Sequence, residues 1–507
     1  MVYRGKPSRA CLECRVKRRK CDLSRPTCRQ CVRAGSRCDG YRDQHSLEFQ
    51  DQTAETLDRS GFLFDNYLPV RSICSNQAVS VSPKLPQKKA TAYQSTEPPH
   101  DPWMMITLSP EQQGLHFFFH HYLVNGAGPS SSHPDCFSTI YARATGHGYL
   151  ANLAIAVGSA SLAYLRNTST LIQAASQSYS RAIRDIRIGL ADPAEAASDQ
   201  MLVSVMLLAL YETVTLDFDN DLNPWDRHVD GALALIQLRG VSQLRNRIGR
   251  SIFLNLRTEL LINCLQRQAR VPLILVNWLN EARHYETAQE APAARLANII
   301  VKACSILALA KEDITNEAKL PQLISELLSV DHDFVYWSEN LPSEYRYETV
   351  TSPDESILAY TGRYDIYPSA DIAHTWNLLR CARIILHQII VEAISILLKA
   401  PSVSPSDSLH IPHRAMLRTS DAEIYENASH ICYSVPYILQ SCGKPVKAGS
   451  LRAVHALPLL WPLYIAGTAY TASDALREWV TTRMEMIKEV TGMQRARLVV
   501  SHSNAPT

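Results

Sequence analysis

Six cysteines between Cys11 and Cys38 repeat one spacing twice. Each half reads Cys-x2-Cys-x6-Cys, and the second half follows the first after 17 positions. A Cys-x2-Cys pair can direct two sulfurs to one metal ion, and structural zinc takes four thiolate or imidazole ligands in a tetrahedron. Six sulfurs are too few for two separate four-cysteine sites, so two Zn²⁺ ions require that two of the cysteines bridge both metals.

The internal repeat predicts which cysteines are shared. Cys11 and Cys28 each open one half, and this equivalent place makes them the natural bridging pair. The expected ligand sets are Cys11, Cys28, Cys14 and Cys21 for one ion, and Cys11, Cys28, Cys31 and Cys38 for the other.

A disulfide framework is the alternative use of six cysteines. Disulfides need an oxidising compartment, and residues 1–10 contain no apolar stretch of the kind found in a secretory signal. The remaining seven cysteines are scattered in mostly apolar surroundings, as reduced core residues of an intracellular protein are. They are Cys74, Cys136, Cys264, Cys304, Cys381, Cys432 and Cys442. This pattern favours metal binding.

A cationic run lies between two of the expected ligands. Five of the six residues between Cys14 and Cys21 are Arg or Lys. Held at both ends by metal ligands, such a run forms a rigid element that can bind phosphates and read bases. A plain solvated charge cluster is the alternative, and the metal frame is what favours a nucleic-acid partner.

Charge is distributed unevenly along the chain. The net charge is only +2, but residues 1–42 carry 13 Lys and Arg against three acidic residues, and the rest carries 38 basic against 46 acidic residues. A small basic head on a mildly acidic body indicates a nucleic-acid-binding module joined to a separate regulatory domain.

The head resembles the fungal Zn(II)2Cys6 binuclear cluster transcription factors. The cysteine frame, the basic run, Cys21-Asp22 and Arg25-Pro26-x-Cys28 carry the resemblance. It implies a zinc-stapled module in a nuclear protein that binds double-stranded DNA at a CGG-type triplet.

The expected short helix after Cys14 places two cations for base reading. Lys17 and Arg18 lie in its middle, and we predict that they reach base edges in the major groove, because Arg or Lys against guanine is the commonest specific contact. The cations predicted to hold phosphates are Arg15, Arg19, Lys20 and Arg9.

Composition divides the chain into four segments. We predict a DNA-binding domain at residues 1–42, a flexible linker at 43–107, an all-α regulatory domain at 108–493 and a tail at 494–507. Six prolines between residues 61 and 107 interrupt any helix in the linker. Residues 43–70 do not keep a heptad pattern, so no dimerising coiled coil is expected there.

The body reads as one helix after another. Ser109-Pro110 followed by Gln112 predicts a helix start with a capping box. Apolar residues recur at spacings of three and four from Ile172 to Leu190, and Met201–Tyr211 is apolar nearly all round and therefore central. Further helices are predicted near 226–239, 243–267, 292–311, 320–338, 370–399, 417–440, 452–472 and 474–490. No alternating run is long enough to indicate a sheet.

One stretch has the length of a membrane span. Val454 to Ala472 holds no full charge, but it contains Pro458 and Pro462. A buried helix pair around a proline break is the preferred interpretation, so no membrane partner is expected.

The body also resembles the fungal-specific transcription factor domain. The segments that carry this resemblance are 210–212, 225–240, 337–342, 364–383 and 459–463. It implies a helical regulatory domain whose partners vary between members. A second copy, another transcription factor and a small-molecule effector are the open choices.

Other constellations favour structural roles. His116 and His120 share a helix face but lack the intervening glutamate of the metalloprotease signature. We expect packing and helix-capping roles, rather than a ligand site, for Trp225, His228 and Arg239. The sequence contains neither a phosphate-binding P-loop nor a Gly-x-Ser-x-Gly motif, so it does not indicate an enzyme.

These observations predict a zinc-dependent, sequence-specific regulator of RNA polymerase II transcription. Its fold would be a small Zn2Cys6 module followed by a flexible linker and a large all-α domain. The resemblance adds the expectation that it regulates a metabolic gene cluster. Two alternatives stay open: a helical enzyme or small-molecule sensor that merely carries the cluster, and a repressor that uses the cluster for protein contacts.

Overall fold

The computed structural model describes residues 10–11, 13–14, 17, 19–24, 27–38, 108–123, 136–143, 148–215, 224–352, 358–399, 410–439 and 451–497. Contacts divide the chain into two compact units, Met1–Tyr93 and Gln94–Thr507. The linker predicted at 43–107 lies outside the described residues, as do residues 498–507 of the predicted tail. The smaller unit contains helix α2 (Arg29–Arg33).

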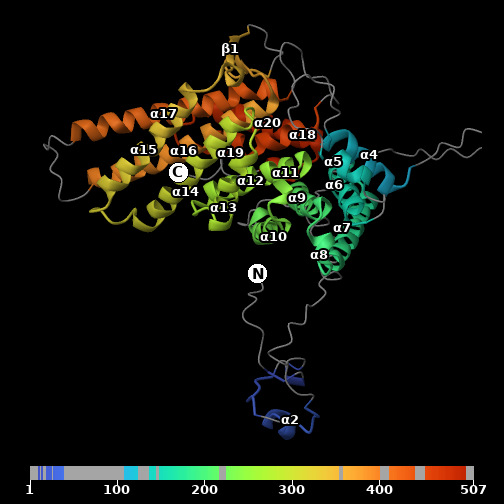
Figure 1. Cartoon of the computed structure of the whole chain (residues 1–507). Coiled ribbons are helices and arrows are strands. Elements are labelled where there is room, and N and C mark those ends of the chain that lie inside the picture. Colours follow the sequence, from blue (N-terminus) through green and yellow to red (C-terminus); the bar gives the residue numbers. More distant parts are fainter. Residues whose placement is uncertain are drawn as a thin grey trace, which may run out of the picture. The chain divides into compact units, whose positions relative to one another are not determined.

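The described part of the larger unit is almost wholly helical (Figure 1). Its first α-helices are α4 (Pro110–Tyr122), α5 (Cys136–Arg143), α6 (Tyr149–Arg166), α7 (Ser169–Gly189), α8 (Pro193–Ala196), α9 (Asp199–Thr215), α10 (Pro224–Arg239), α11 (Ser242–Arg245), α12 (Arg247–Arg267) and α13 (Leu273–Ala282). Those that follow are α14 (Ala291–Asp313), α15 (Leu320–Glu339), α16 (Ala370–Lys399), α17 (His410–Ile438), α18 (Ala453–Ala456), α19 (Leu460–Thr468) and α20 (Asp474–Thr491). The short 3-10 helices are η1 (Arg283–Tyr285), η2 (Ser343–Tyr345), η3 (Leu457–Leu459) and η4 (Gln494–Arg497). The predicted helical class is confirmed.

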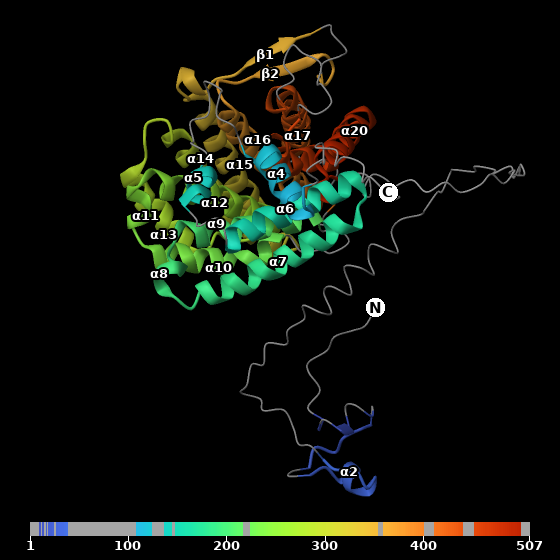
Figure 2. The same cartoon turned by 90° about the vertical axis from the view of Figure 1, so that its right-hand side faces the viewer.

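Helix α6 is the centre of the N-terminal half of the body. It packs against α4, α7 and α9 (Figure 2). Its crossing with α4 depends on two glycines that face each other. A Cβ added at Gly158 would lie 1.9 Å from the carbonyl oxygen of Gly114, and one added at Gly114 would lie 2.8 Å from the Ser159 nitrogen. Any side chain at either position would therefore force the two helices apart.

The start of α4 follows the predicted capping box. Gln112 N donates to Ser109 Oγ at 3.2 Å, and Ser109 N donates to Gln112 Oε1 at 2.9 Å. Pro110 occupies the first helical position, where its missing N–H leaves no hydrogen bond unmade. The local signal in the sequence is thus sufficient to fix this helix end.

Helix α16 is the centre of the C-terminal half. It packs against α14, α15 and α17, and an antiparallel hairpin of β1 (Glu348–Thr351) and β2 (Arg363–Ile366) contacts α17 (Figures 1 and 2). The hairpin pairs Glu348 with Ile366 and Thr351 with Arg363. It is an addition to the predicted all-helical body, because four residues per strand are too few to give a clear alternating pattern.

A buried ion pair attaches the hairpin to the helices. Asp365 on β2 has no exposed surface, and its Oδ2 accepts hydrogen bonds from Arg380 Nη2 at 3.1 Å and from the Tyr367 hydroxyl at 2.9 Å. Thr349 donates to Oδ1 at 2.8 Å, and His430 Nδ1 lies 3.3 Å from Oδ2. Burial raises the pKa of the Asp365 carboxyl, but His430 and Arg380 outweigh this effect and hold that pKa below its ordinary value.

The apolar stretch with two prolines forms a broken, buried helix. Residues 453–468 divide into α18, η3 and α19, with Pro458 in η3 and Pro462 near the start of α19. Leu459 and Leu463 have no exposed surface. The predicted helix pair around a proline break is confirmed.

Two other helices, α14 and α16, have the length and apolar composition that a membrane span would need. Half of each apolar window is buried within the structure. Core helices of helical domains share these properties, so length and composition alone are weak grounds for a span.

Candidate metal centre and nucleic-acid interface

Four cysteine sulfurs form the core of the small unit. Cys11, Cys14, Cys28 and Cys31 are at most 2% exposed. Cys11 Sγ lies 3.6 Å from Cys28 Sγ and 3.7 Å from Cys31 Sγ. Cys14 Sγ lies 3.6 Å and 3.9 Å from the same two sulfurs. A disulfide would bring two sulfurs to about 2.05 Å, so these four separations belong to another arrangement.

The separations suit zinc. With zinc–sulfur bonds of about 2.3 Å, a tetrahedron places its sulfurs about 3.8 Å apart. Two overlapping groups have all their sulfurs within 4.8 Å of one another, and both contain Cys11 and Cys28. The groups are Cys11, Cys14, Cys21 and Cys28, and Cys11, Cys28, Cys31 and Cys38. Within the described parts of the chain, no other set of His, Cys, Asp or Glu side chains converges in this way.

The thiols of this core resist ionisation without a metal. Burial raises the pKa of the Cys31 thiol to about 12, and it also raises the pKa of Cys11 and of Cys14. Zinc binds the thiolate, so metal binding at these residues must release protons.

The repeat in the sequence is also a repeat in the backbone. Two hydrogen bonds of the first half have counterparts 17 residues later, and the distances agree closely. The bonds run from Lys17 N to Glu13 O and from Ala34 N to Gln30 O, at 3.0 and 3.1 Å, and from Arg19 N to Cys14 O and from Ser36 N to Cys31 O, at 2.8 and 3.0 Å. The two halves therefore share one local fold around the sulfurs.

Asp22 fixes the start of α2 in the second half. Its Oδ1 accepts a hydrogen bond from Arg29 N at 3.1 Å, and its Oδ2 accepts one from Ser24 Oγ at 2.9 Å. Desolvation raises the pKa of the Asp22 carboxyl, but the hydrogen bonds from Ser24 and from the Arg29 backbone lower it below the ordinary value. A carboxylate at this place also suits the positive end of the helix.

Three of the six cations predicted to contact DNA lie in the described part of the head. Lys17, Arg19 and Lys20 are exposed. Arg9, Arg15 and Arg18 lie outside the described residues.

Lys17 already has partners within the head. Its ammonium forms an ion pair with Glu13 and donates to Ser36 Oγ at 3.3 Å. The same ammonium lowers the pKa of the Glu13 carboxyl. Sequence reasoning missed both partners. The spacing of Glu13 and Lys17 by four residues is a usable helical signal, whereas the contact with Ser36 joins the two halves and leaves no local trace.

The second half also presents cations. The exposed arginines of this half are Arg29, Arg33 and Arg37, and no DNA contact is predicted for them. Only Arg33 and Arg37 lie between Cys31 and Cys38, whereas the equivalent stretch between Cys14 and Cys21 holds five cations. The denser charge therefore lies in the first half.

Several residues of the body were weighed above as possible ligands. Those that the structure describes have packing or hydrogen-bonding roles. His116 and His120 are exposed and belong to no converging ligand group within the described residues. The buried Arg239 guanidinium bonds the Ala197 carbonyl at 3.1 Å, and His228 Nε2 lies 3.4 Å from Glu212 Oε1. The Trp225 side chain lies outside the described residues.

Comparison with known proteins finds one family match within each unit. Residues 9–47 match the fungal Zn(2)-Cys(6) binuclear cluster domain, and residues 116–269 match the fungal specific transcription factor domain. An aspercryptin biosynthesis cluster-specific transcription regulator of Emericella nidulans is 35% identical over 57 residues, which are 11% of this chain and 9% of that protein. The chain thus matches less than a tenth of this relative. No solved structure matches.

The chain therefore carries the domain pair of the fungal zinc cluster transcription factors. Its head is a zinc-binding, DNA-binding domain, and its helical body contains a fungal specific transcription factor domain at residues 116–269. Both matched families are transcription factor domains, and neither is an enzyme family.

Proposed function

We propose that this protein is a nuclear transcription factor that binds specific DNA sequences and regulates RNA polymerase II transcription. The observation that supports this most directly is the run of cations between Cys14 and Cys21, in a unit whose buried sulfurs have zinc-like separations. In the remaining chain, acidic residues outnumber basic ones. DNA binding is therefore a task of the head.

Zinc supplies the rigidity that a head of this size needs. The six cysteines would hold two Zn²⁺ ions, with Cys11 and Cys28 shared between them. A single Cys-rich module of about 40 residues buries too little apolar surface to fold without such a staple. Metal removal would therefore abolish DNA binding through loss of the folded head.

Base reading is assigned to the first half. Lys17 and Arg18 would contact base edges in the major groove, and guanines of a CGG-type triplet suit both side chains. Lys17 would first exchange its present partners Glu13 and Ser36 for a base. The proposed phosphate contacts are Arg9, Arg15, Arg19 and Lys20.

The curated relative suggests the biological setting. It is named as the regulator of one biosynthetic gene cluster. We extend this to the present chain, as a pathway-specific regulator of a metabolic gene cluster. Its division into a head at 1–42, a linker at 43–107, a regulatory domain at 108–493 and a tail at 494–507 belongs to the same proposal.

Selection from a random DNA pool tests this function. Full-length, zinc-loaded protein is used at near-physiological salt, with and without a chelator. Enrichment of a CGG-type triplet that vanishes with chelator is expected. One triplet indicates a monomer on DNA, and two at a fixed spacing indicate a second copy. No enrichment, together with retained binding to a protein partner, would instead favour a repressor that uses the cluster for protein contacts.

The base-reading role is tested by one matched pair of variants. Arg18→Ala should weaken binding to the selected site by about 1–3 kcal/mol and binding to random DNA only slightly. Arg33→Ala removes an exposed arginine from the second half and should leave the preference for the selected site intact. Equal losses on both DNAs in Arg18→Ala would contradict the assignment.

A further inference from the structure

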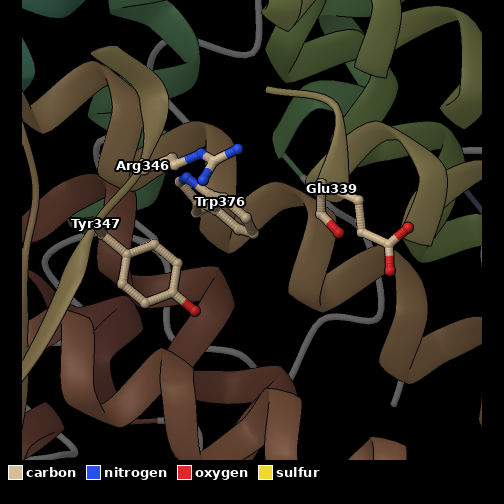
Figure 3. Close-up of a pocket in the computed structure, with 5 residues that line it drawn as sticks. Glu339, Arg346, Tyr347 and Trp376 are labelled. Atoms are coloured by element: carbon tan, nitrogen blue, oxygen red, sulfur yellow. The ribbon is translucent and has the colours of Figure 1, made fainter. Parts of the chain in front are cut away.

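The body contains a small open pocket beside the hairpin. It has a volume of ≈ 320 Å³ and is lined by Ser338, Glu339, Arg346, Tyr347 and Trp376. In the view of Figure 3, Arg346 overlaps Trp376, with Tyr347 on one side of them and Glu339 on the other. The residues come from the end of α15, from the segment before β1 and from the start of α16.

Two aromatic rings form a fixed corner in this pocket. The Tyr347 and Trp376 rings meet edge to face, with centroids 4.9 Å apart and planes at 84°. Trp376 Nε1 donates to the Tyr345 carbonyl at 2.9 Å, and its ring packs edge-on against Trp337 at 5.5 Å. Because these contacts hold the rings in place, the corner is preformed for a flat apolar group.

A buried cation already occupies one side of these rings. The guanidinium carbon of Arg380 lies 5.0 Å from the Tyr347 centroid and 5.7 Å from the Trp376 centroid. Only 2% of Arg380 is exposed. A second cation over the same rings would be repelled, so the corner does not suit a quaternary ammonium group. A neutral aromatic ring meets no such penalty.

The rim carries one charge of each sign. Arg346 and Glu339 are both exposed. Among the described residues, neither side chain has an ion-pair partner. A guanidinium binds a carboxylate with two parallel hydrogen bonds, and a carboxylate pairs well with an ammonium group. The rim therefore complements a molecule that carries both charges.

We propose that this pocket binds a free aromatic amino acid. The aromatic ring would lie in the corner of Trp376 and Tyr347, the carboxylate would bind Arg346 and the ammonium group would bind Glu339. A volume of ≈ 320 Å³ is at the lower end of the range for small-molecule sites, roughly 300–1,000 Å³, which suits one amino acid and not a dinucleotide cofactor. The site goes beyond DNA reading and involves the body alone.

Calorimetric titration of the full-length, zinc-loaded protein tests the site. The probes are phenylalanine, tyrosine and tryptophan, and three analogues that each lack one feature: leucine lacks the ring, hydrocinnamate the amine and phenethylamine the carboxylate. Saturable binding of one or more aromatic amino acids at one site per chain is expected, with all three analogues weaker. No saturable binding of any aromatic amino acid, or leucine binding as well as these do, would overturn the proposal.

Two variants separate the two charges of the rim. Arg346→Gln should weaken amino acid binding about tenfold and hydrocinnamate binding similarly. Glu339→Gln should weaken amino acid binding about tenfold but leave hydrocinnamate unchanged, because that analogue has no ammonium group.

Matched controls remove an exposed charge elsewhere on the body. Arg184→Gln on α7 and Glu312→Gln on α14 should bind like the unaltered protein. All four positions are exposed, so the thermal unfolding of each variant should be unchanged. Amino acid binding that is as tight in Arg346→Gln as in the unaltered protein would overturn the site. The titration contains no DNA, so its failure is distinct from a failure of the proposed DNA reading.

Discussion

Two cysteines belong to both converging sulfur groups, whereas each of the other four belongs to only one. If Cys11 and Cys28 bridge both ions, then Cys11→Ala or Cys28→Ala should disturb both sites, and Cys38→Ala should affect one site first. Counting zinc per purified chain measures this, with Ser36→Ala as a control that leaves all six sulfurs in place.

The same count also tests the number of ions. Equal losses in the three cysteine variants would contradict the bridging assignment. One ion per unaltered chain would instead indicate that the four buried sulfurs, Cys11, Cys14, Cys28 and Cys31, form the whole site.

The buried pair of Asp365 and Arg380 should be costly to break from one side. Asp365→Ala leaves a buried guanidinium without its carboxylate, which should lower the free energy of unfolding by about 3–5 kcal/mol. Urea unfolding measures the loss. Lys302→Ala is the matched control, because Lys302 pairs with Asp333 at 2.9 Å on the surface, where 63% of the lysine side chain is exposed. The control should cost at most about 1 kcal/mol. Similar losses in the two variants would mean that Asp365 is not a critical partner.

Local chemistry decides which residues could be predicted. The convergence of the sulfurs from Cys11 to Cys38 could be anticipated, because metal ligation fixes both residue type and spacing, and both can be read along the chain. The buried pair of Asp365 and Arg380 was not found, because its partners are joined only by the tertiary fold and each resembles an ordinary surface charge. The contact between the Tyr347 and Trp376 rings was not predicted either, because only the tertiary fold brings these two residues together.

Helices differ in how clearly the sequence marks them. The start of α4 was predicted because Ser109, Pro110 and Gln112 form a local capping signal. Helix α6 was missed, since its Ala, Gly and Ser residues are buried on nearly every side and leave no polar stripe. The same small residues allow its close crossing with α4. They therefore both remove the amphipathic pattern that would have predicted the helix and determine where the helix packs.

The contact of α4 with α18 should weaken in mild acid. Burial, with smaller effects of His120 and Arg452, lowers the pKa of His121 on α4 to about 4. Burial, with smaller effects of Arg452 and His374, lowers the pKa of His455 on α18 to about 4. Both values lie below the ordinary value of about 6.5, so the unfolded chain takes up protons first as the pH falls.

Stability conferred by the neutral histidines is therefore complete above about pH 6.5 and is lost as the pH falls toward 4. The full pKa shift from 6.5 to about 4 would cost about 2 kcal/mol per histidine at about pH 5. Both side chains are partly exposed, so solvent screening should reduce the loss to about 1 kcal/mol, which urea unfolding at this pH and at neutral pH would measure. His121→Gln should reduce the difference between the two pH values. An unchanged difference in this variant would show that His121 does not titrate as its burial requires.

The division of labour between head and body should appear in the salt dependence of DNA binding. Four proposed phosphate contacts predict that log K falls with log salt at a slope of about −4. Fluorescence anisotropy of the full chain on its selected site would measure the slope. Lys20→Ala should make the slope shallower by about 1 and weaken all DNA sequences alike. A slope that stays the same in Lys20→Ala would place the phosphate contacts elsewhere.

Composition alone predicted the separation of a basic unit from a helical one. The excess of cations before residue 42 and the prolines after residue 61 are both visible without a structure. The packing of the body's helices against one another was harder to predict from the sequence. Many of these helices are apolar on several faces, so the sequence does not show which face of one helix contacts its neighbour. Close contacts such as Gly114 with Gly158 settle that choice, and they depend on shape rather than on pattern.

The backbone repeat of the head is the pattern that duplication of one half would produce. Hydrogen bonds that recur after 17 residues are what a duplicated ancestral half would leave behind, with one metal-binding turn copied and the pair closed by shared sulfurs. After such a duplication the ligands are constrained in both copies, while the residues between them are free to diverge. In the present chain, Lys17, Arg18 and Arg19 of the first half stand where the second half has Ala34, Gly35 and Ser36. If the first half reads DNA as proposed, exchanging the stretches 15–20 and 32–37 should transfer the DNA-facing surface to the opposite half of the same frame.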